Sequence, residues 1–263
     1  MGKCKKLSSA LLLFVTLLAT VGLFLIISYS SFAQGLTPEE IMKKVDDNQH
    51  IESARIEAEM IIRDRGREMV KEMIIYMESI DNSSNALSEF TNPRDRGTKY
   101  FKLGDELWMY FPDAEDLISI SGHMMREGMM GSDFSYEDAL ESKNLTALYK
   151  FELIGEEIIG DRNTYIISGT AREGEEVSYY SRKLWVDQER YVILKEEYFT
   201  TGGRLMKVME IEEVQEFKNN RWFPVIKVMN DKLREGSQTI LKINEIDFDY
   251  VITKDKISLD TLQ

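Results

Sequence analysis

The stretch RKLWVDQERYVILKEEYFTTGGRLMKVMEIEEVQEF, residues 182–217, decides the fold. It contains three runs rich in branched and aromatic residues, at 182–187, 191–199 and 204–217, which short polar or glycine-containing segments separate. Branched and aromatic residues favour extended chain, and breaks of a few residues let neighbouring strands pair antiparallel. The stretch therefore predicts three consecutive antiparallel strands.

Outward from this stretch, the same pattern covers most of the chain. Runs of strand character occur at 56–62, 69–77, 98–103, 106–112, 148–157, 164–171, 221–231 and 237–250, with a shorter one at 117–121. Together they predict roughly ten or eleven strands at short spacing, which is typical of a barrel or sandwich of antiparallel meanders. Because no charged linker, low-complexity tract or internal repeat interrupts them, we expect one domain over residues 36–263.

Two short helices are expected beside these strands. The segment TPEEIMKKVDDN at 37–48 begins with Thr37 as N-cap and has Glu40 three residues later, which is the pattern of a capping box. Residues 122–147 form the longest stretch without strand pattern. Within it, SYEDAL at 135–140 predicts a short helix capped by Ser135.

The N-terminal residues 1–33 have the pattern of an export segment. Lys3, Lys5 and Lys6 precede an uncharged apolar run at 7–28, and small residues follow near position 33. A signal peptide usually has an apolar run of about 7–15 residues, whereas about 20 can span a bilayer. A cleaved signal peptide and a retained membrane anchor through residues 7–28 both remain open, and either predicts an extracytoplasmic domain, periplasmic or cell-surface.

Composition excludes several functions. The chain has 33 basic and 46 acidic residues, for a formal charge of −13, and such an acidic surface disfavours nucleic acid. Its one cysteine, Cys4, precedes the apolar run, so the exported part has no disulfide and no acylated cysteine of its own. The acidic surface is interpreted as a solvated face, with a basic partner as the minority alternative.

The sequence offers no constellation for catalysis or for a metal. His123 and Glu127 are four residues apart, but the flanking glycines argue against a shared helix face, so His123 is interpreted as a surface residue. The acids Asp133, Glu137 and Asp138 lack the spacing of a calcium loop. Ser132 has no nucleophile-elbow motif around it, and a triad would need His50 or His123. The residues therefore give no positive evidence of catalysis.

The segment GHMMREGMMGSDFSYED at 122–138 contains four methionines within seven positions, bounded by glycines. Methionine is flexible and polarisable, and it is common where a surface accepts varied apolar partners. Two interpretations are open: a loop that folds down as a plug of the core, or a methionine-lined lid over a cavity. On the nearby strand, Trp108 and Tyr110 share one face and Met109 and Phe111 the other, and one of these faces must point inward.

Several segments together resemble the outer-membrane lipoprotein-sorting protein family, the LolA-like proteins. They are FTNPRDRGTKYFKL (90–103), LWMYFP (107–112), MGSDFSYED (130–138), LWVDQERYVILKEEYFTTGGRLMKVMEIEEV (184–214), RWFPVIKVMND (221–231) and GSQTILKINEIDFDY (236–250). The resemblance implies a mainly β, half-open antiparallel barrel or curved sheet that encloses short helices and an apolar cavity. In LolA and LolB that cavity holds the acyl chains of lipoproteins. The resemblance also implies export, no cofactor and no catalysis.

These observations predict a carrier for lipid or for acylated lipoprotein. Two sets of residues are expected to serve it, one that binds the ligand and one that holds the loop in place. The ligand-binding set comprises Trp108, Tyr110, Met124, Met125, Met129, Met130 and Phe134. The latch of the loop comprises Arg96, Gly97, Asp133 and Tyr136, with an ion pair expected between Arg96 and Asp133. We expect a monomer, with a membrane transporter or receptor as a further candidate partner. The alternative is a membrane-tethered protein-interaction module without lipid cargo.

Overall fold

A computed structural model of the chain describes residues 35–80, 83–140, 145–253 and 255–262. The chain divides into two units, Met1–Leu36 and Thr37–Gln263, and the second contains all of the strands that the structure describes. The predicted signal or anchor at residues 1–33 lies outside the described residues. No helix in the part of the chain that the structure describes is long and apolar enough to cross a membrane.

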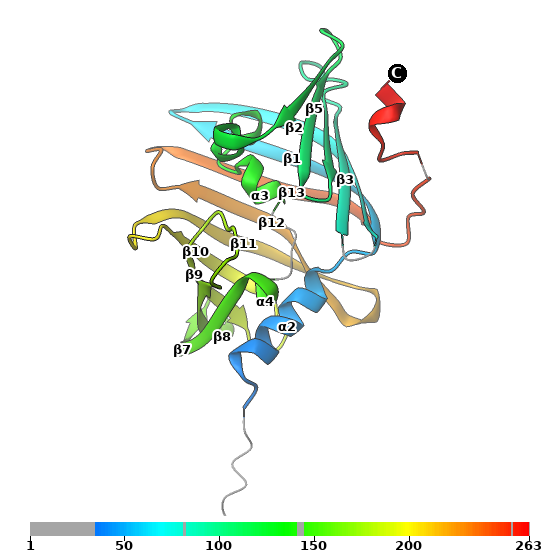
Figure 1. The fold of residues 1–263 in the computed structure, drawn as a ribbon. Coiled ribbons are helices and arrows are strands. Elements are labelled where there is room, and N and C mark those ends of the chain that lie inside the picture. Colours follow the sequence, from blue (N-terminus) through cyan, green and yellow to red (C-terminus); the bar gives the residue numbers. More distant parts are fainter. Residues whose placement is uncertain (1–34, 81–82, 141–144, 254, 263) are drawn as a thin grey trace, which may run out of the picture. The chain divides into compact units, whose positions relative to one another are not determined.

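Strands dominate the second unit and join into one sheet (Figure 1). They are β1 (Ser53–Asp64), β2 (Arg67–Ile80), β3 (Ser83–Phe90), β4 (Lys99–Leu103), β5 (Glu106–Phe111), β6 (Asp116–Ile120), β7 (Tyr149–Ile159), β8 (Arg162–Ala171), β9 (Ser181–Asp187), β10 (Ile193–Phe199), β11 (Leu205–Phe217), β12 (Arg221–Asp231) and β13 (Ser237–Asp247). The spatial order is β6-β5-β4-β3-β2-β1-β13-β12-β11-β10-β9-β8-β7, and the pairings are antiparallel. Because β6 and β7 each have one neighbour, the curved sheet stays unclosed, which confirms the predicted half-open fold.

Each of the twelve runs of strand character contains a strand, and one more strand brings the described residues to thirteen, against the roughly ten or eleven expected. The strand without a sequence signal is β3, whose sequence SSNALSEF is rich in small polar residues. It pairs with β2 on one side and β4 on the other. Pairing to two neighbours supplies the backbone hydrogen bonds that stabilise a strand of low intrinsic preference, so tertiary context overrides propensity here.

Alternation along β1 shows how the sheet separates its two faces. Buried side chains at Ala54, Ile56, Ala58, Met60 and Ile62 alternate with more exposed neighbours. A side-chain period of two places all five on one face, which is the concave face of the sheet. The partner strands β2 and β13 contribute apolar side chains to the same face, so the middle of the sheet carries a continuous apolar surface.

Short helices pack at this concave side. Helix α2 (Pro38–Gln49) has the predicted capping box, since Thr37 Oγ1 accepts from Glu40 N at 3.2 Å and Glu40 Oε2 accepts from Thr37 N at 2.8 Å. It contacts α4 (Leu145–Leu148), β7 and β12. Helix α3 (Tyr136–Leu140) follows the 3-10 turns η2 (Gly122–Arg126) and η3 (Met129–Gly131). Two further 3-10 turns are η4 (Lys218–Asn220) and η5 (Leu259–Leu262).

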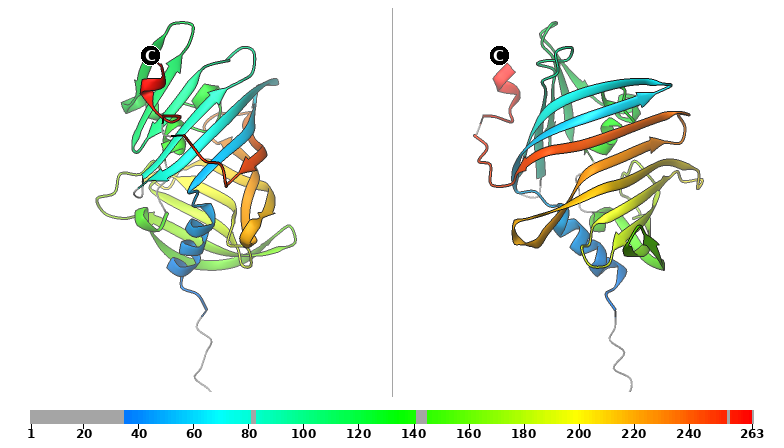
Figure 2. Two further views of the ribbon diagram at one scale, coloured as in Figure 1. Left: turned by 90° about the vertical axis from the view of Figure 1, so that its right-hand side faces the viewer. Right: turned by 180° about the vertical axis from the view of Figure 1, so that it is seen from behind.

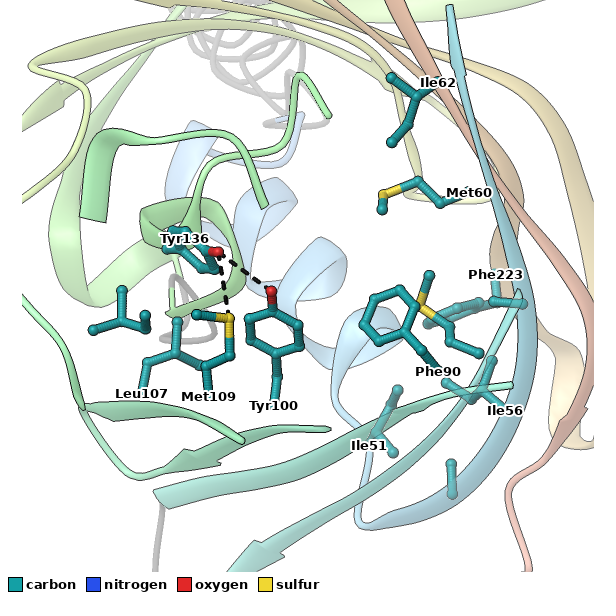
Figure 3. Packing of buried hydrophobic residues seen from close by; sticks show 14 residues of the cluster. Ile51, Ile56, Met60, Ile62, Phe90, Tyr100, Leu107, Met109, Tyr136 and Phe223 are labelled. Atoms are coloured by element: carbon teal, nitrogen blue, oxygen red, sulfur yellow. Dashed lines mark hydrogen bonds between the residues drawn. The ribbon is translucent and has the colours of Figure 1, made fainter. Parts of the chain in front are cut away.

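Each face of the sheet has its own apolar cluster. The concave cluster includes Met60, Phe90, Tyr100, Tyr136 and Phe223, whose side chains converge in Figure 3. The convex cluster is smaller and contains Tyr76, Leu87, Phe101 and, from the C-terminal segment, Ile257. Figure 2 shows that segment running outside the sheet beside β3 to β5. The end of the chain therefore covers apolar side chains on the convex face.

Candidate functional site

A cavity of about 460 Å³ lies on the concave side of the sheet. The three middle strands supply an apolar wall, which consists of Ile56, Ala58 and Met60 from β1, Met73, Ile75 and Met77 from β2, and Leu241 and Ile243 from β13. Their side chains share one face because each strand contributes every second residue. A volume of this size lies within the ~300–1,000 Å³ typical of sites for small molecules.

One flank of the cavity is polar. Ser79 from β2, Ser84 and Ser88 from β3 and Lys102 from β4 line it. Lys102 is 5% exposed, and its Nζ donates to Ser84 Oγ at 3.3 Å. Burial lowers the pKa of Lys102 from 10.5 to about 8, an effect that the charge of Asp105 opposes. This flank combines a buried ammonium with hydroxyl groups.

The opposite flank holds a buried ion pair. Arg182 Nη1 on β9 and Glu196 Oε1 on β10 are 2.7 Å apart, and both side chains are less than a twentieth exposed. Tyr198 donates from its hydroxyl to Glu196 Oε2 at 3.0 Å. The guanidinium of Arg182 also lies over the rings of Tyr149, at 4.8 Å, and Tyr198, at 5.1 Å. Because each charge has a partner, the pair can remain in the wall of an apolar cavity.

Two carboxylates in the cavity wall hold helices in place. Asp46 of α2 accepts from the backbone N–H groups of Leu145 and Thr146, so it caps the first turn of α4. Burial raises the pKa of Asp46, and hydrogen bonds from Thr146 and Leu145 oppose the increase. Asp138 of α3 accepts from Lys207 Nζ at 2.7 Å. Ser135 caps α3 as predicted, and Asp138 completes a capping box by accepting from the backbone N–H of Ser135 at 2.7 Å.

The segment 128–136 folds over the rim of the cavity as a compact turn. Gly128 and Ser135 form an isolated antiparallel bridge, and Met129 N donates to Phe134 O at 2.8 Å. A Cβ at position 128 would collide with the carbonyl oxygen of Ser132, so the turn requires glycine there. Met129 and Phe134 line the cavity from this turn.

Asp133 ties this turn to the sheet. Its side chain is buried and accepts from Ser237 Oγ at 2.5 Å and Thr239 Oγ1 at 2.7 Å, both on β13. Arg234 Nη1 lies 3.6 Å from Asp133 Oδ1. The predicted ion pair between Arg96 and Asp133 is therefore wrong. Arg96 lies exposed in the connection between β3 and β4.

Tyr136, another latch residue, joins the turn to β4 and β5. Its hydroxyl lies 3.3 Å from that of Tyr100 and 3.9 Å from the sulfur of Met109, as Figure 3 shows. Tyr100 donates to the sulfur of Met130 at 3.1 Å. Gly97 has a φ of +84° and closes the β3–β4 connection by donating from its N–H to Phe90 O. Neither Arg96 nor Gly97 lines the cavity.

The structure separates the predicted ligand-binding residues into three groups. Met129 and Phe134 line the cavity. Met124, Met125 and Met130 pack against the concave cluster but do not line the cavity. The assignment of Trp108 and Tyr110 to the cavity is wrong, because both pack on the convex cluster. The inward face of β5 carries Leu107 and Met109 instead, since the direction in which the sheet curves decides which face is inside.

Sequence reasoning missed most of the cavity wall. The missed residues include Met60, Met73, Tyr100, Lys102, Arg182, Glu196, Lys227 and Leu241. Their alternation along each strand is visible in the sequence, but alternation defines two faces without saying which one is concave. Among the described residues, no group of three or more His, Cys, Asp or Glu side chains is arranged to hold a metal ion.

Comparisons with known proteins agree with this architecture. Residues 82–263 match the model of a protein family with the description "Uncharacterized protein". A DUF1329 family protein from Desulfovibrio piger has a TM-score of 0.79 at 23% identity, covering 87% of this chain and 100% of the other. No curated protein matches the chain significantly in sequence.

Two more solved structures share the fold. A domain from Vibrio parahaemolyticus, named for outer membrane lipoprotein sorting, has a TM-score of 0.76 at 20% identity and covers 86% of this chain and 97% of the other. A LolA superfamily protein from Nitrosomonas europaea has a TM-score of 0.70 at 20% identity, covering 86% and 100%. These likenesses show a LolA-like fold, as the resemblance of the sequence predicted.

Proposed function

The chain belongs to the family whose model matches residues 82–263, and we propose that it is an extracytoplasmic, non-catalytic carrier of lipid or lipoprotein acyl chains. The observation that carries the proposal is the apolar wall that β1, β2 and β13 present to a cavity of about 460 Å³. The fold it shares with a domain named for lipoprotein sorting supports the same assignment. The proposed location follows from the export pattern of residues 1–33.

The chemistry of the wall suits an acyl chain. Each methylene removed from water contributes about 0.8 kcal/mol, so an apolar cavity holds a long chain without a polar anchor. Met60, Met73, Met77 and Met129 line the cavity. Methionine side chains repack at modest free-energy cost, which favours uptake of chains of different shape. The unclosed sheet leaves an edge through which a chain can enter and leave without unfolding of the domain.

The polar residues of the cavity support binding more than catalysis. Glu196 is held by Arg182, Asp138 by Lys207, and Asp46 by the N-terminus of α4. A general acid or base must reach a substrate with a labile proton, whereas these three carboxylates are already committed to partners in the protein. In the proposed carrier, these three carboxylates hold the walls of the cavity in place.

Native mass spectrometry tests the proposal directly. The chain would be expressed with export, purified without detergent, and measured intact, and its lipids would then be extracted and identified. We expect a lipid or acylated peptide to co-purify with the protein and to be released when the protein unfolds. A mass without cargo, together with no uptake of added fatty acids or lipopeptides, would contradict the carrier function.

One surface favours a second function, binding of a protein partner. The edge strand β7 exposes Leu153, Ile154 and Ile158. An edge strand with apolar side chains is a template for pairing with an added strand. If the chain carries no lipid, this surface can be tested by comparing how the wild-type chain and Ile158→Lys cross-link to a protein partner. A partner that cross-links equally to both would show that β7 is not the binding surface.

A further inference from the structure

Lys227 places a cation in the apolar wall of the cavity. It lies on β12, directly opposite Ile211 of β11 and Leu241 of β13. Both of these neighbours line the cavity, as does Met229 two residues further along β12. The residues beside Lys227 on its own face of the sheet are therefore apolar, and none of their side chains offers an oxygen or nitrogen acceptor to its ammonium group.

The other charged groups of the cavity wall have partners within the protein. Arg182 and Glu196 pair with each other, Asp138 pairs with Lys207, Asp46 caps α4, and Lys102 donates to Ser84. The ammonium group of Lys227, in contrast, makes no hydrogen bond and no ion pair with any side chain that the structure describes. Its nearest favourable contact is the ring of Phe223, 5.9 Å from Nζ. Glu196 influences it through charge alone, because Arg182 and Tyr198 already hold that carboxylate.

The side chain of Lys227 is partly exposed, and its ammonium group has no direct counter-charge among the described residues. Transfer of a charge from water to an apolar environment raises its free energy unless a counter-charge compensates. Burial accordingly lowers the pKa of Lys227, and the charge of Glu196 opposes the change. A methionine or leucine would fill the same space without this cost. The ammonium is explained if the cavity's occupant brings an anionic group to it.

We propose that Lys227 binds the anionic head group of the cargo, and that the cargo is an amphiphile with an apolar chain and a carboxylate or phosphate. This inference rests on the proposed carrier function and narrows it. The apolar chain would lie against Met60, Met73 and Ile243, and the head group would lie at β12. Carboxylate and phosphate are both acceptors for an ammonium, so the site recognises their shared chemistry.

Binding of three ligands with the same hexadecyl chain tests the proposal. Hexadecanoate, hexadecyl phosphate and the neutral hexadecanol would be titrated, below the concentration at which they form micelles, into the full chain carrying a displaceable fluorescent fatty acid. The variants are Lys227→Met, which keeps the size of the side chain without its charge, and Lys227→Arg, which restores a cation. Lys242→Met on the adjacent strand β13 is the matched control, because Lys242 is exposed.

The wild-type chain is expected to bind at least one anionic ligand about tenfold or more tightly than hexadecanol. Lys227→Met should abolish that preference and leave hexadecanol binding unchanged, Lys227→Arg should retain most of it, and Lys242→Met should behave as wild type. The stronger of the two anionic ligands identifies the head group as carboxylate or phosphate. A preference that survives in Lys227→Met, or equal binding of all three ligands to wild type, would overturn the inference while leaving the carrier function standing. Binding of none of the three would overturn the carrier function itself.

Discussion

Thr239 donates its hydroxyl hydrogen to Asp133 Oδ2 at 2.7 Å, and the same hydroxyl oxygen accepts from the backbone N–H of Asp133 at 2.9 Å. This two-way contact joins the turn at the rim of the cavity to the middle of the sheet. The turn itself contributes Met129 and Phe134 to the cavity wall. The position of two cavity residues therefore depends on one buried carboxylate and on a strand more than a hundred residues away in the sequence.

Asp133→Ala should lower the free energy of unfolding by about 2–4 kcal/mol, because it leaves the hydroxyls of Ser237 and Thr239 without their acceptor in a buried site. Urea denaturation measures the change. Asp113→Ala, which removes an exposed carboxylate from the β5–β6 turn, is the control and should change stability by less than about 0.5 kcal/mol. Equal effects of the two substitutions would show that Asp133 does not anchor the turn.

Met129→Gln should weaken binding of a long-chain ligand by about tenfold, because an amide in the cavity wall must lose its hydration when the chain enters. Met125→Gln is the matched control, since Met125 packs against the concave cluster without lining the cavity. Displacement of a fluorescent fatty acid gives both affinities. An equal loss in the two variants would indicate a general effect on the loop instead of a contact with the ligand.

Trp108→Ala and Leu107→Gln compare adjacent residues on opposite faces of β5. Trp108 packs on the convex cluster, so its loss should destabilise the fold by about 1–3 kcal/mol and leave ligand affinity within about twofold. Leu107 lines the cavity, so a glutamine there should reduce affinity severalfold. The affinity measurement shows which of the two faces of β5 contacts the ligand. A large loss of affinity in Trp108→Ala would mean that the ligand reaches the convex side.

Lys102→Met should stabilise the protein at pH values below 8. Burial lowers the pKa of Lys102 from 10.5 in the unfolded chain to about 8 in the folded protein, so the charged amine opposes folding while both states are protonated. As the pH rises from 8 to 10.5, the folded state loses its proton first and this penalty disappears. The advantage of the variant, on the order of 1–3 kcal/mol, should therefore shrink across that window. Urea denaturation of both proteins as a function of pH measures the difference in their free energies of unfolding. A difference that does not change with pH would contradict the lowered pKa of Lys102.

Glu196→Gln should cost about 3–5 kcal/mol of stability, because it leaves the buried guanidinium of Arg182 without its counter-charge. Replacing both residues by methionine removes both charges, so the double variant should lose much less than the sum of the two single replacements. A cycle of urea denaturation curves on the single and double variants gives the coupling. Additive losses would mean that the two charges do not interact in solution.

Local patterns in the sequence determined the elements of this protein. The three strands of 182–217 and the caps of Thr37 and Ser135 are all present, because alternation and capping side chains act between residues close in the chain. The exception is β3, whose small polar residues form a strand through pairing to β2 and β4. Longer segments of the same regions carry the resemblance that predicts the LolA-like architecture.

Tertiary structure alone decided which residues face the cavity. On β5 the sequence presents two faces of similar apolar character, and only the curvature of the whole sheet places Leu107 inside and Trp108 outside. Asp133 takes its partners from β13 and its neighbouring turn, far along the chain, where the sequence suggested Arg96. Lys227 lies between Ile211 and Leu241 only because β12 pairs with β11 and β13. A period of two separates the faces of each strand, but the direction of curvature and the pairing of distant strands are set by the packing of the complete sheet.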